Sequence, residues 1–301
     1  MKILFYIGVR NLWRNYRRTL MTLIVLTVAH ISIVLVDSFS LGTTRTMIDT
    51  ITHLYMGHGQ IHHKDYPATK DLNFIIEDPN QLYKALNNID EIESFTPRVF
   101  NLGMISSSYD VATVQFVGID YDTEKKVSKI KDSIILGDYP RKEDRENSII
   151  IGSKLANNLE ITIGDKVVVT LTTRDSGELI QEMFRIKSIV HFNARAMDSF
   201  LAFIDIGRMQ NLIKQTNGIH EVALKLKSRD ENYTTNDSLW KTIQFDHLTI
   251  EPWYDLLPSL KAIIEMNQYG IIIISGILFI LVFLTIMNTL FMSIFERLFE
   301  F

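Results

Sequence analysis

The stretch Tyr269–Ile294, YGIIIISGILFILVFLTIMNTLFMSI, decides the fold of this 301-residue chain. It contains no Asp, Glu, Lys or Arg, and the nearest charged residues are Glu265 before it and Glu296 after it. About 20 apolar residues are enough for a helix to cross the hydrocarbon core of a bilayer. The favourable free energy of inserting its Ile, Leu, Val and Phe side chains into the membrane outweighs the unfavourable free energy of inserting Asn288. The sequence therefore predicts a transmembrane helix at 269–294.

A second apolar segment begins at Thr19 and carries no formal charge until Asp37, which predicts another transmembrane helix over 19–41. His30 lies inside it. An ionisable residue within a membrane is a functional candidate, although a neutral histidine bonded to a neighbouring helix is the simpler interpretation. The small-x-small pattern at 38–40 also fits a cleaved signal peptide. Because the apolar stretch exceeds the usual length of such a signal, an uncleaved anchor is expected.

The first 18 residues predict an amphipathic helix at the membrane interface. Its basic face consists of Arg10, Arg14, Arg17 and Arg18, and apolar residues occupy the opposite face. An ordinary charged flank, or the n-region of a signal peptide, is the alternative interpretation. Because basic residues remain on the cytoplasmic side, the N-terminus is expected there. Two spans return the C-terminus to the cytoplasm and place residues 42–268 outside, with membrane lipid as a partner.

Composition excludes several classes of protein. The net charge of −4 and the absence of a basic surface argue against nucleic-acid binding. The chain has no cysteine, which excludes disulfides, thiolate metal sites and a thiol nucleophile. Phosphate-loop, dinucleotide, nucleophile-elbow and zinc-protease motifs are absent from the sequence. We therefore expect no enzyme activity, no catalytic residue and no cofactor, so that any nucleotide would be bound by another chain.

Four histidines, at 53, 58, 62 and 63, are the strongest candidates for metal ligands. Adjacent residues in a strand point to opposite faces, so His62 and His63 do not serve one site simply. A metal site needs convergent ligands of defined geometry. We therefore do not predict a metal site in the segment from His58 to His63.

The part between the two spans predicts an α+β domain at 42–268, in one or two lobes. The first helix keeps its periodicity until Gly57-His58-Gly59 ends it, and helical spacing resumes at Pro258 and runs into the second span. Between them, strands are predicted at 59–67, 91–99, 102–106, 111–118, 148–151, 166–172, 179–190, 200–204, 221–226 and 248–251. Helices are predicted at 78–86, 154–158, 208–214 and 236–243, and a hairpin turn at 174–177.

Several segments, in this order, resemble one family. These are RNLWRNYRR at 10–18, GHGQIHHKDY at 57–66, FVGID at 116–120, IIIGSKLANNLEITIGDKVVV at 149–169, WYDLLP at 253–258 and NT…ERLFEF at 288–301. They are similar to motifs in the permease subunits of ABC transporters of the macrolide-exporter, lipoprotein-releasing and FtsX-like type (MacB/LolC/LolE/FtsX). The segment at 149–169 is the most specific match. The fold class that follows is a membrane protein with two transmembrane helices flanking a MacB-like periplasmic core domain.

The resemblance implies a mechanical role in the bacterial inner membrane. A separate cytoplasmic ATPase binds ATP, and the permease transmits its motion to the periplasmic domain, for lipoprotein release or efflux. Partners would be the ATPase, a second permease copy or paralogue, and a lipoprotein or periplasmic protein. Family members have four spans, so the resemblance implies that 295–301 is the start of a coupling helix in a chain truncated after its second span. The residues implied to dock the ATPase are Glu296, Arg297, Phe299, Glu300 and Phe301.

Three other interpretations remain open. The segment after the second span could be a plain polar stop. The whole chain could be a two-span sensor whose external domain binds a ligand, or an FtsX-like regulator of an external cell-wall hydrolase.

Overall fold

The computed structural model describes most of the chain as two compact units. One unit contains Met1–Ile48 and Pro258–Phe301, and the other is Asp49–Leu257. We call them the helical unit and the α+β unit. The described residues are 16–66, 73–141, 147–173, 177–215, 217–227 and 247–295, together with Tyr6, Arg10, Trp13 and Asp144. The domain predicted at 42–268 includes a helical stalk at each end, and in the structure the helical residues up to Ile48 and from Pro258 onward belong to the helical unit.

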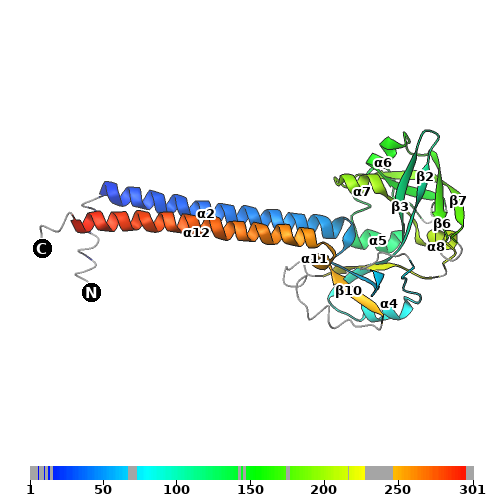
Figure 1. The fold of residues 1–301 in the computed structure, drawn as a ribbon, viewed down its shortest axis with the longest axis horizontal. Helices are drawn as coiled ribbons and strands as arrows, with labels where there is room; N and C mark the ends of the chain where they lie inside the picture. The colour runs from blue at the N-terminus through cyan, green and yellow to red at the C-terminus, as the bar shows by residue number, and fades with distance from the viewer. Residues whose placement is uncertain are drawn as a thin grey trace. The chain divides into compact units, whose positions relative to one another are not determined.

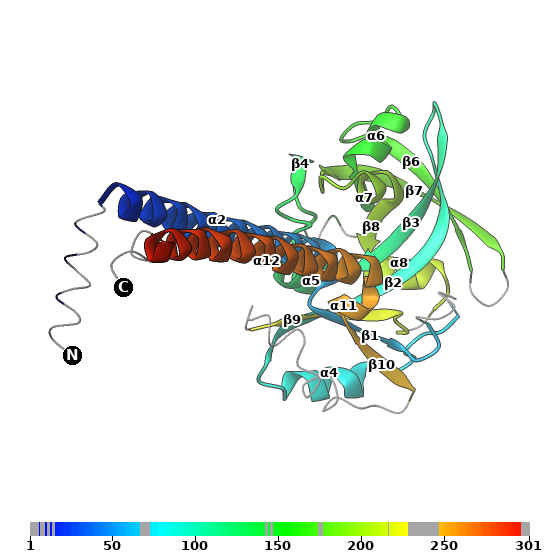
Figure 2. The same cartoon turned by 60° about the vertical axis from the view of Figure 1, so that its left-hand side comes forward.

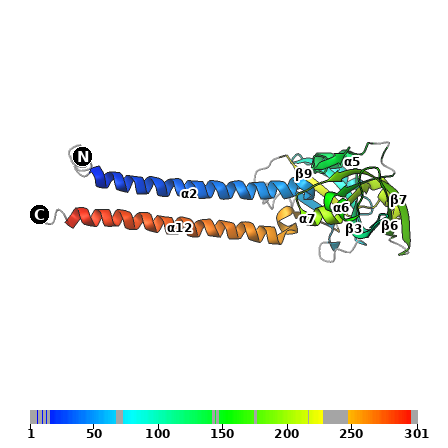
Figure 3. The ribbon, with the colours of Figure 1, turned by 90° about the horizontal axis from the view of Figure 1, so that it is seen from above.

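Two long helices form the described part of the helical unit. Helix α2 spans Tyr16–Ile51 and helix α12 spans Pro258–Phe295, and the two lie side by side (Figures 1 and 3). Within the described residues, the segments Thr19–Met56 and Pro258–Met292 are long and apolar enough to cross a membrane, with mean hydropathies of 2.4 and 2.9. Both helical predictions are confirmed, including the continuation of the first helix beyond its apolar part and the start of the second at Pro258.

The secondary structure of the α+β unit agrees closely with the predicted pattern. Its strands are β1 (Gly59–His63), β2 (Ile92–Ser106), β3 (Val111–Ile119), β4 (Ile134–Gly137), β5 (Ser148–Gly152), β6 (Lys166–Thr172), β7 (Leu179–Val190), β8 (Leu201–Asp205), β9 (Glu221–Leu226) and β10 (Leu248–Pro252). Its helices are the π-helix η1 (Thr52–Met56), α4 (Asn80–Asn87), α5 (Tyr121–Val127), α6 (Ser153–Asn158), α7 (Arg195–Phe200), α8 (Ile206–Leu212) and α11 (Trp253–Leu256).

Strand pairing divides the α+β unit into two lobes. The first lobe is an antiparallel sheet in the order β10-β1-β9-β2, accompanied by α4 (Figure 2). In the second lobe, the pairings β2-β3-β8-β5-β7 continue through β6, which pairs with both β7 and β2. Among the described strands, these six therefore close into a ring, with β4 added at β7. The ring encloses apolar side chains, as expected for a small barrel.

Strand β2 belongs to both lobes. Its first half pairs with β9 from Ile92 to Arg98, and its second half pairs with β3 from Arg98 to Ser106. The prediction of two strands, at 91–99 and 102–106, was wrong. Phe100 and Asn101 continue the ladder with β3, and no residue in this part of the strand forces a turn. A single 15-residue strand thus connects the sheet to the ring.

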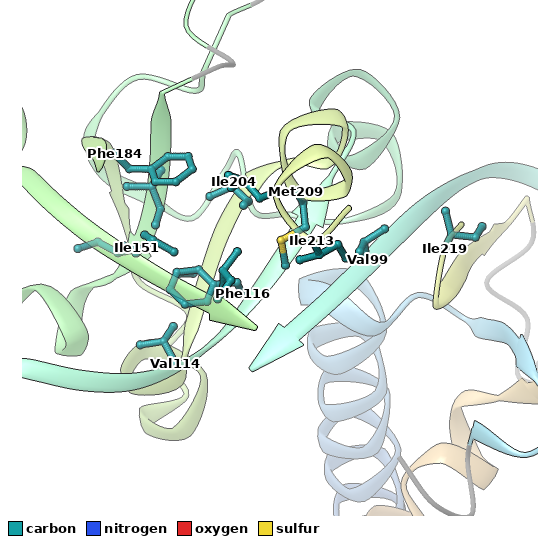
Figure 4. Packing of buried hydrophobic residues seen from close by; sticks show 14 of the residues in the cluster. Val99, Val114, Phe116, Ile151, Phe184, Ile204, Met209, Ile213 and Ile219 are labelled. Atoms are coloured by element: carbon teal, nitrogen blue, oxygen red, sulfur yellow. The ribbon is translucent and has the colours of Figure 1, made fainter. Parts of the chain in front are cut away.

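A buried apolar core fills both lobes. It extends from Ile61 and Val222 in the sheet to Phe116, Ile151 and Phe184 in the ring. Figure 4 shows Met209 of α8 and Ile213, which follows α8, beside Val99 of β2. Burial of each such side chain stabilises the fold by about 1.5–3 kcal/mol relative to exposure.

The remaining differences concern short elements and undescribed residues. Helices α5 and α7 and strand β4 were not predicted, because each is too short to show periodicity. Asp78 was predicted to start a helix. Helix α4 begins two residues later, and the carboxylate of Asp78 accepts a hydrogen bond from the N–H of Asn80 at 3.1 Å. The predicted helix at 236–243 and most of the predicted turn at 174–177 lie outside the described residues.

Candidate functional site

A completely buried arginine, Arg98 of β2, joins the two lobes to the chain that enters the α+β unit. Its Nη2 donates to Glu124 Oε1 at 2.6 Å and to the carbonyl of Tyr55 at 2.6 Å, and its Nε donates to Glu124 Oε2 at 3.2 Å. Its Nη1 donates to Glu221 Oε1 at 2.7 Å. The hydroxyl of Thr96 lies 3.2 Å from Glu124 Oε2 and donates to it. We call these five residues the Arg98 centre. It links η1, β2, α5 and β9.

Arg98 stays charged although it is buried. Burial by itself lowers the pKa of Arg98, but the neighbouring carboxylates of Glu124 and Glu221 outweigh it and raise the pKa above its ordinary value. The guanidinium also lies over the ring of Tyr55, 4.2 Å from the centroid. Burial raises the pKa of the Tyr55 hydroxyl, so this side chain stays neutral. Charge-assisted, bidentate hydrogen bonds are the strongest class in proteins, which makes the Arg98 centre a firm attachment.

The π-helical turn η1 is held by backbone bonds on several sides. The N–H of Lys129 donates to the carbonyl of His53 at 2.8 Å. Gly57 ends the turn at φ +79°, and a Cβ atom there would approach Leu224 O to 2.7 Å, so only glycine fits. His58 then donates its N–H to Leu224 O at 2.8 Å and accepts the N–H of Leu226 at Nδ1. The predicted helix end at Gly57-His58-Gly59 is confirmed.

The four histidines of this region have separate surroundings. His53 and His58 meet edge to face, with ring centroids 5.2 Å apart. Along β1, His62 is buried and stacks on Tyr66, whereas His63 is half-buried. Among the described residues, no three His, Cys, Asp or Glu side chains are grouped as metal ligands would be. The structure thus gives the segment His58–His63 a packing role in the sheet.

Burial determines the protonation of His58. It lowers the pKa of this histidine to about 4, with a further contribution from His53. The ring is therefore neutral at pH 7, which leaves Nδ1 able to accept the N–H of Leu226.

In the helical unit, polar side chains join α2 and α12 at two points. Asn267 Nδ2 donates to Ser40 Oγ at 2.8 Å, and the hydroxyls of Thr22 and Thr289 are 3.5 Å apart. A groove of about 370 Å³ lies beside the second contact and is lined in part by Asn288. His30 was expected to form a hydrogen bond with a neighbouring helix. His30 is exposed on α2 and has no hydrogen bond with the described part of α12.

The residues predicted to form sites fall mainly outside the described residues. This holds for Glu296, Arg297, Phe299, Glu300 and Phe301, for Arg14, and for the side chain of Arg18. Arg10 and Arg17 are helical and exposed, and Arg17 Nε donates to the hydroxyl of Tyr16 at 3.1 Å. Both the ATPase-docking set and the basic face remain predictions.

Sequence reasoning missed the Arg98 centre. The available signal was a charged residue at an inward position of a strand, since Thr96, Arg98 and Phe100 share one face of β2. Its partners are 26 and 123 residues away along the chain. An inward arginine predicts a buried partner but does not say which carboxylate supplies it.

Two candidate membrane helices on either side of an α+β unit define a class of membrane protein with one large domain outside the bilayer. Residues 19–239 match the family model described as the MacB-like periplasmic core domain. The chain belongs to this family.

Individual relatives are distant. The chain is 23% identical, over 150 residues, to the lipoprotein-releasing system transmembrane protein LolE of Haemophilus influenzae; the match covers 48% of this chain and 36% of that protein. It thus spans about a third of the length of this curated relative. Two solved structures are similar. The periplasmic region of MacB from Actinobacillus actinomycetemcomitans gives a TM-score of 0.46 at 16% identity, covering 69% of this chain and 92% of that one. The extracellular domain of the noncanonic ABC-type transporter YknZ from Gram-positive bacteria gives 0.44 at 11% identity, covering 64% and 97%.

Proposed function

We propose that this chain acts as a permease subunit of an ABC transporter, in which a separate ATPase drives motion of the extracytoplasmic domain. The observation that carries this proposal is the family match, which runs from the first candidate span deep into the α+β unit. The similarity to LolE favours lipoprotein release as the process, with efflux as the alternative. A second permease copy or a paralogue would complete the complex. The chain itself would hold no nucleotide and would not be an enzyme.

The proposed location is the bacterial inner membrane, crossed by α2 and α12. The basic residues near the N-terminus, including Arg10 and Arg17, favour a cytoplasmic N-terminus. The same argument gives a cytoplasmic C-terminus and an extracytoplasmic α+β unit. Cysteine accessibility tests this arrangement cleanly, because the natural chain has none. A cysteine at the exposed Ser108 should react with a membrane-impermeant maleimide in intact spheroplasts. A cysteine at position 11, in the N-terminal segment that is expected in the cytoplasm, should react only after lysis.

The Arg98 centre suggests how motion would enter the domain. The turn η1 follows α2 directly along the chain, and Arg98 holds the backbone of that turn through Tyr55. The same guanidinium binds one carboxylate on α5 and one on β9. A force applied at η1 would therefore reach elements of the sheet without a flexible intermediate. We propose that the Arg98 centre is the point where movement of α2 is transferred to the α+β unit.

The coupling role is tested at the segment that follows α12. We expect Glu296→Lys and Glu300→Lys to reduce the amount of ABC ATPase that co-purifies with the chain by about tenfold or more, because each substitution reverses a charge at the proposed docking interface. Co-expression with a candidate ABC ATPase of the same organism, followed by affinity purification in detergent, measures this.

The matched control is Glu265→Lys, which places the same charge change before the predicted second span. It should leave the ATPase yield unchanged. Equal recovery with all three variants would contradict the coupling role and would favour the sensor interpretation.

A further inference from the structure

Strand β2 has an open stretch on the side where it changes partner. On that side it pairs with β9 up to Arg98 and with β6 from Met104 onward. Within the described residues, Val99–Gly103 has no strand partner there. The N–H of Phe100 points to this side, since it donates to His220 Nδ1 at 3.1 Å. By the alternation of a strand, the N–H and C=O of Leu102 point the same way.

A cavity of about 270 Å³ lies at this opening. Its lining combines the apolar side chains of Phe100, Leu102 and Ile213 with the polar ones of Asn101, Gln215 and His220. None of the lining residues that the structure describes is Asp, Glu, Lys or Arg. The volume is slightly below the range of about 300–1,000 Å³ typical of small-molecule pockets. A cavity of this size and composition suits a small uncharged group that can form hydrogen bonds.

Gln215 is the unusual member of this lining. Its side chain is 6% exposed, yet neither Nε2 nor Oε1 forms a hydrogen bond with any described residue. Burial of an unpaired carboxamide costs free energy, and such groups in native proteins call for an explanation. A ligand that supplies one acceptor and one donor would satisfy both atoms.

The surrounding loop fixes the position of this carboxamide. The N–H of Gln215 donates to Gln210 O at 2.9 Å, and Gln210 Nε2 donates to Gly218 O at 3.0 Å. A Cβ atom at Gly218 would lie 2.5 Å from Gln215 Nε2, so glycine is needed for the side chain to keep its place. Lys214 and Asn217 adopt φ of +57° and +58°. Such strained residues cluster at ligand sites.

We propose that this cavity binds a short, uncharged segment of extended peptide. The C=O of one residue of the extended segment accepts from Gln215 Nε2, and the N–H of the same residue, which points to the same side of the segment, donates to Gln215 Oε1. The exposed backbone of Leu102 continues the pairing along β2, in the manner of strand addition to a sheet edge. Charged termini are disfavoured, because no charged side chain among the described lining residues offsets their loss of hydration. This site is independent of any ATPase partner and stands whether or not the transport proposal holds.

The test uses the full chain in detergent micelles with its glutamine side chains labelled with ¹⁵N. N-acetyl-L-alanine methylamide is the probe, because it is uncharged and carries two peptide groups. We expect a saturable shift of the Gln215 amide resonance. N-acetyl-L-alanine, which ends in a carboxylate, should bind at least about tenfold more weakly because its charge is not compensated. Equal binding of both compounds, or no saturable shift, would overturn the proposal.

Variants separate ligand binding from a structural role. Gln215→Leu should abolish binding while the midpoint of thermal unfolding stays the same or rises, since two unpaired polar atoms are removed. Gly218→Ala should weaken binding by displacing the carboxamide. Gln181→Leu, on the exposed side of β7, is the matched control and should bind normally. Unchanged binding by Gln215→Leu contradicts the assignment, as does a loss of stability in that variant without any loss of binding.

Discussion

The Arg98 centre and the Gln215 cavity lie along the same strand, only a few residues apart, but differ in how their buried polar atoms are satisfied. In the Arg98 centre, the guanidinium donates four hydrogen bonds to carboxylate and carbonyl oxygens. In the cavity, both atoms of the Gln215 carboxamide lack a partner among the described residues. The comparison teaches that complete pairing produces a fixed joint, whereas incomplete pairing, at a site with room beside it, leaves capacity for a ligand.

The largest effect on stability is expected when the arginine of the Arg98 centre is replaced. Arg98→Met leaves Glu124 and Glu221 buried without their cation, and we expect a loss of about 3–5 kcal/mol in the free energy of unfolding. Urea unfolding of the full chain in detergent, followed by circular dichroism, measures this loss. Arg195→Met removes an exposed arginine of α7 and should cost no more than about 0.5 kcal/mol. Similar losses in the two variants would show that the Arg98 centre is not a firm attachment.

Acidification tests a second attachment, in which His58 accepts the N–H of Leu226 in β9. Its pKa in the folded chain is about 4, whereas an unfolded histidine titrates near pH 6.5. Between these values the unfolded state binds more protons than the folded state, so stability is complete above pH 6.5 and falls as the pH decreases towards 4. The loss should reach about 3 kcal/mol. Unfolding midpoints recorded across this interval give the slope.

The control for this titration is His58→Asn. The amide oxygen of asparagine can accept the N–H of Leu226, as Nδ1 of His58 does, but it does not titrate. The decline between pH 6.5 and 4 should flatten in this variant, and an unaltered decline would assign the effect to another group.

The two carboxylates of the Arg98 centre should contribute unequally to stability, and replacing either one should have a smaller effect than replacing Arg98. Glu124 binds the guanidinium twice and also accepts from Thr96, whereas Glu221 binds it once. Glu124→Gln should therefore cost about 2–3 kcal/mol and Glu221→Gln about 1–2 kcal/mol, as expected for lost hydrogen bonds to charged groups. The same urea titration provides both values. A reversed order would mean that β9, and not α5, holds the arginine in place.

The smallest effect concerns stability at the cavity. Gln215→Leu should leave the free energy of unfolding unchanged or raise it by up to about 1 kcal/mol, because no protein hydrogen bond is lost. Arg98→Met should thus lower the free energy of unfolding, whereas Gln215→Leu should leave it unchanged or raise it. This contrast is what we expect for a paired and an unpaired buried group. A loss of more than about 1 kcal/mol in the free energy of unfolding of Gln215→Leu would mean that the Gln215 side chain forms a stabilising hydrogen bond within the protein.

Much of the fold could be predicted from the sequence, because it depends on local patterns. The long apolar runs predict α2 and α12, and alternation gives β6, β7 and β9 with the bounds observed. What could not be predicted depends on pairing between distant segments. The closure of the ring through β6 and the meeting of Arg98 with Glu221 both join residues more than 60 positions apart. No local rule specifies such partners.

The candidate sites follow the same division. Gln215 stands in an ordinary polar loop between α8 and β9, and nothing in the sequence around it signals burial. Its importance arises because β2 passes from β9 to β6 at that point. The histidines near His58, in contrast, attract attention in the sequence, but the structure explains them by packing and a backbone hydrogen bond.

The pairing of β1 with β10 has a consequence for the order of synthesis. The first strand of the α+β unit, Gly59–His63, has Leu248–Pro252 as one of its neighbours, so this pair forms only after almost 190 intervening residues have been made. Contacts so distant in sequence slow folding. The sheet of the first lobe therefore cannot reach its final form before β10, which lies only a few residues ahead of α12, has been made. Folding of the domain and insertion of the second helix would then be nearly simultaneous events in the life of the nascent chain.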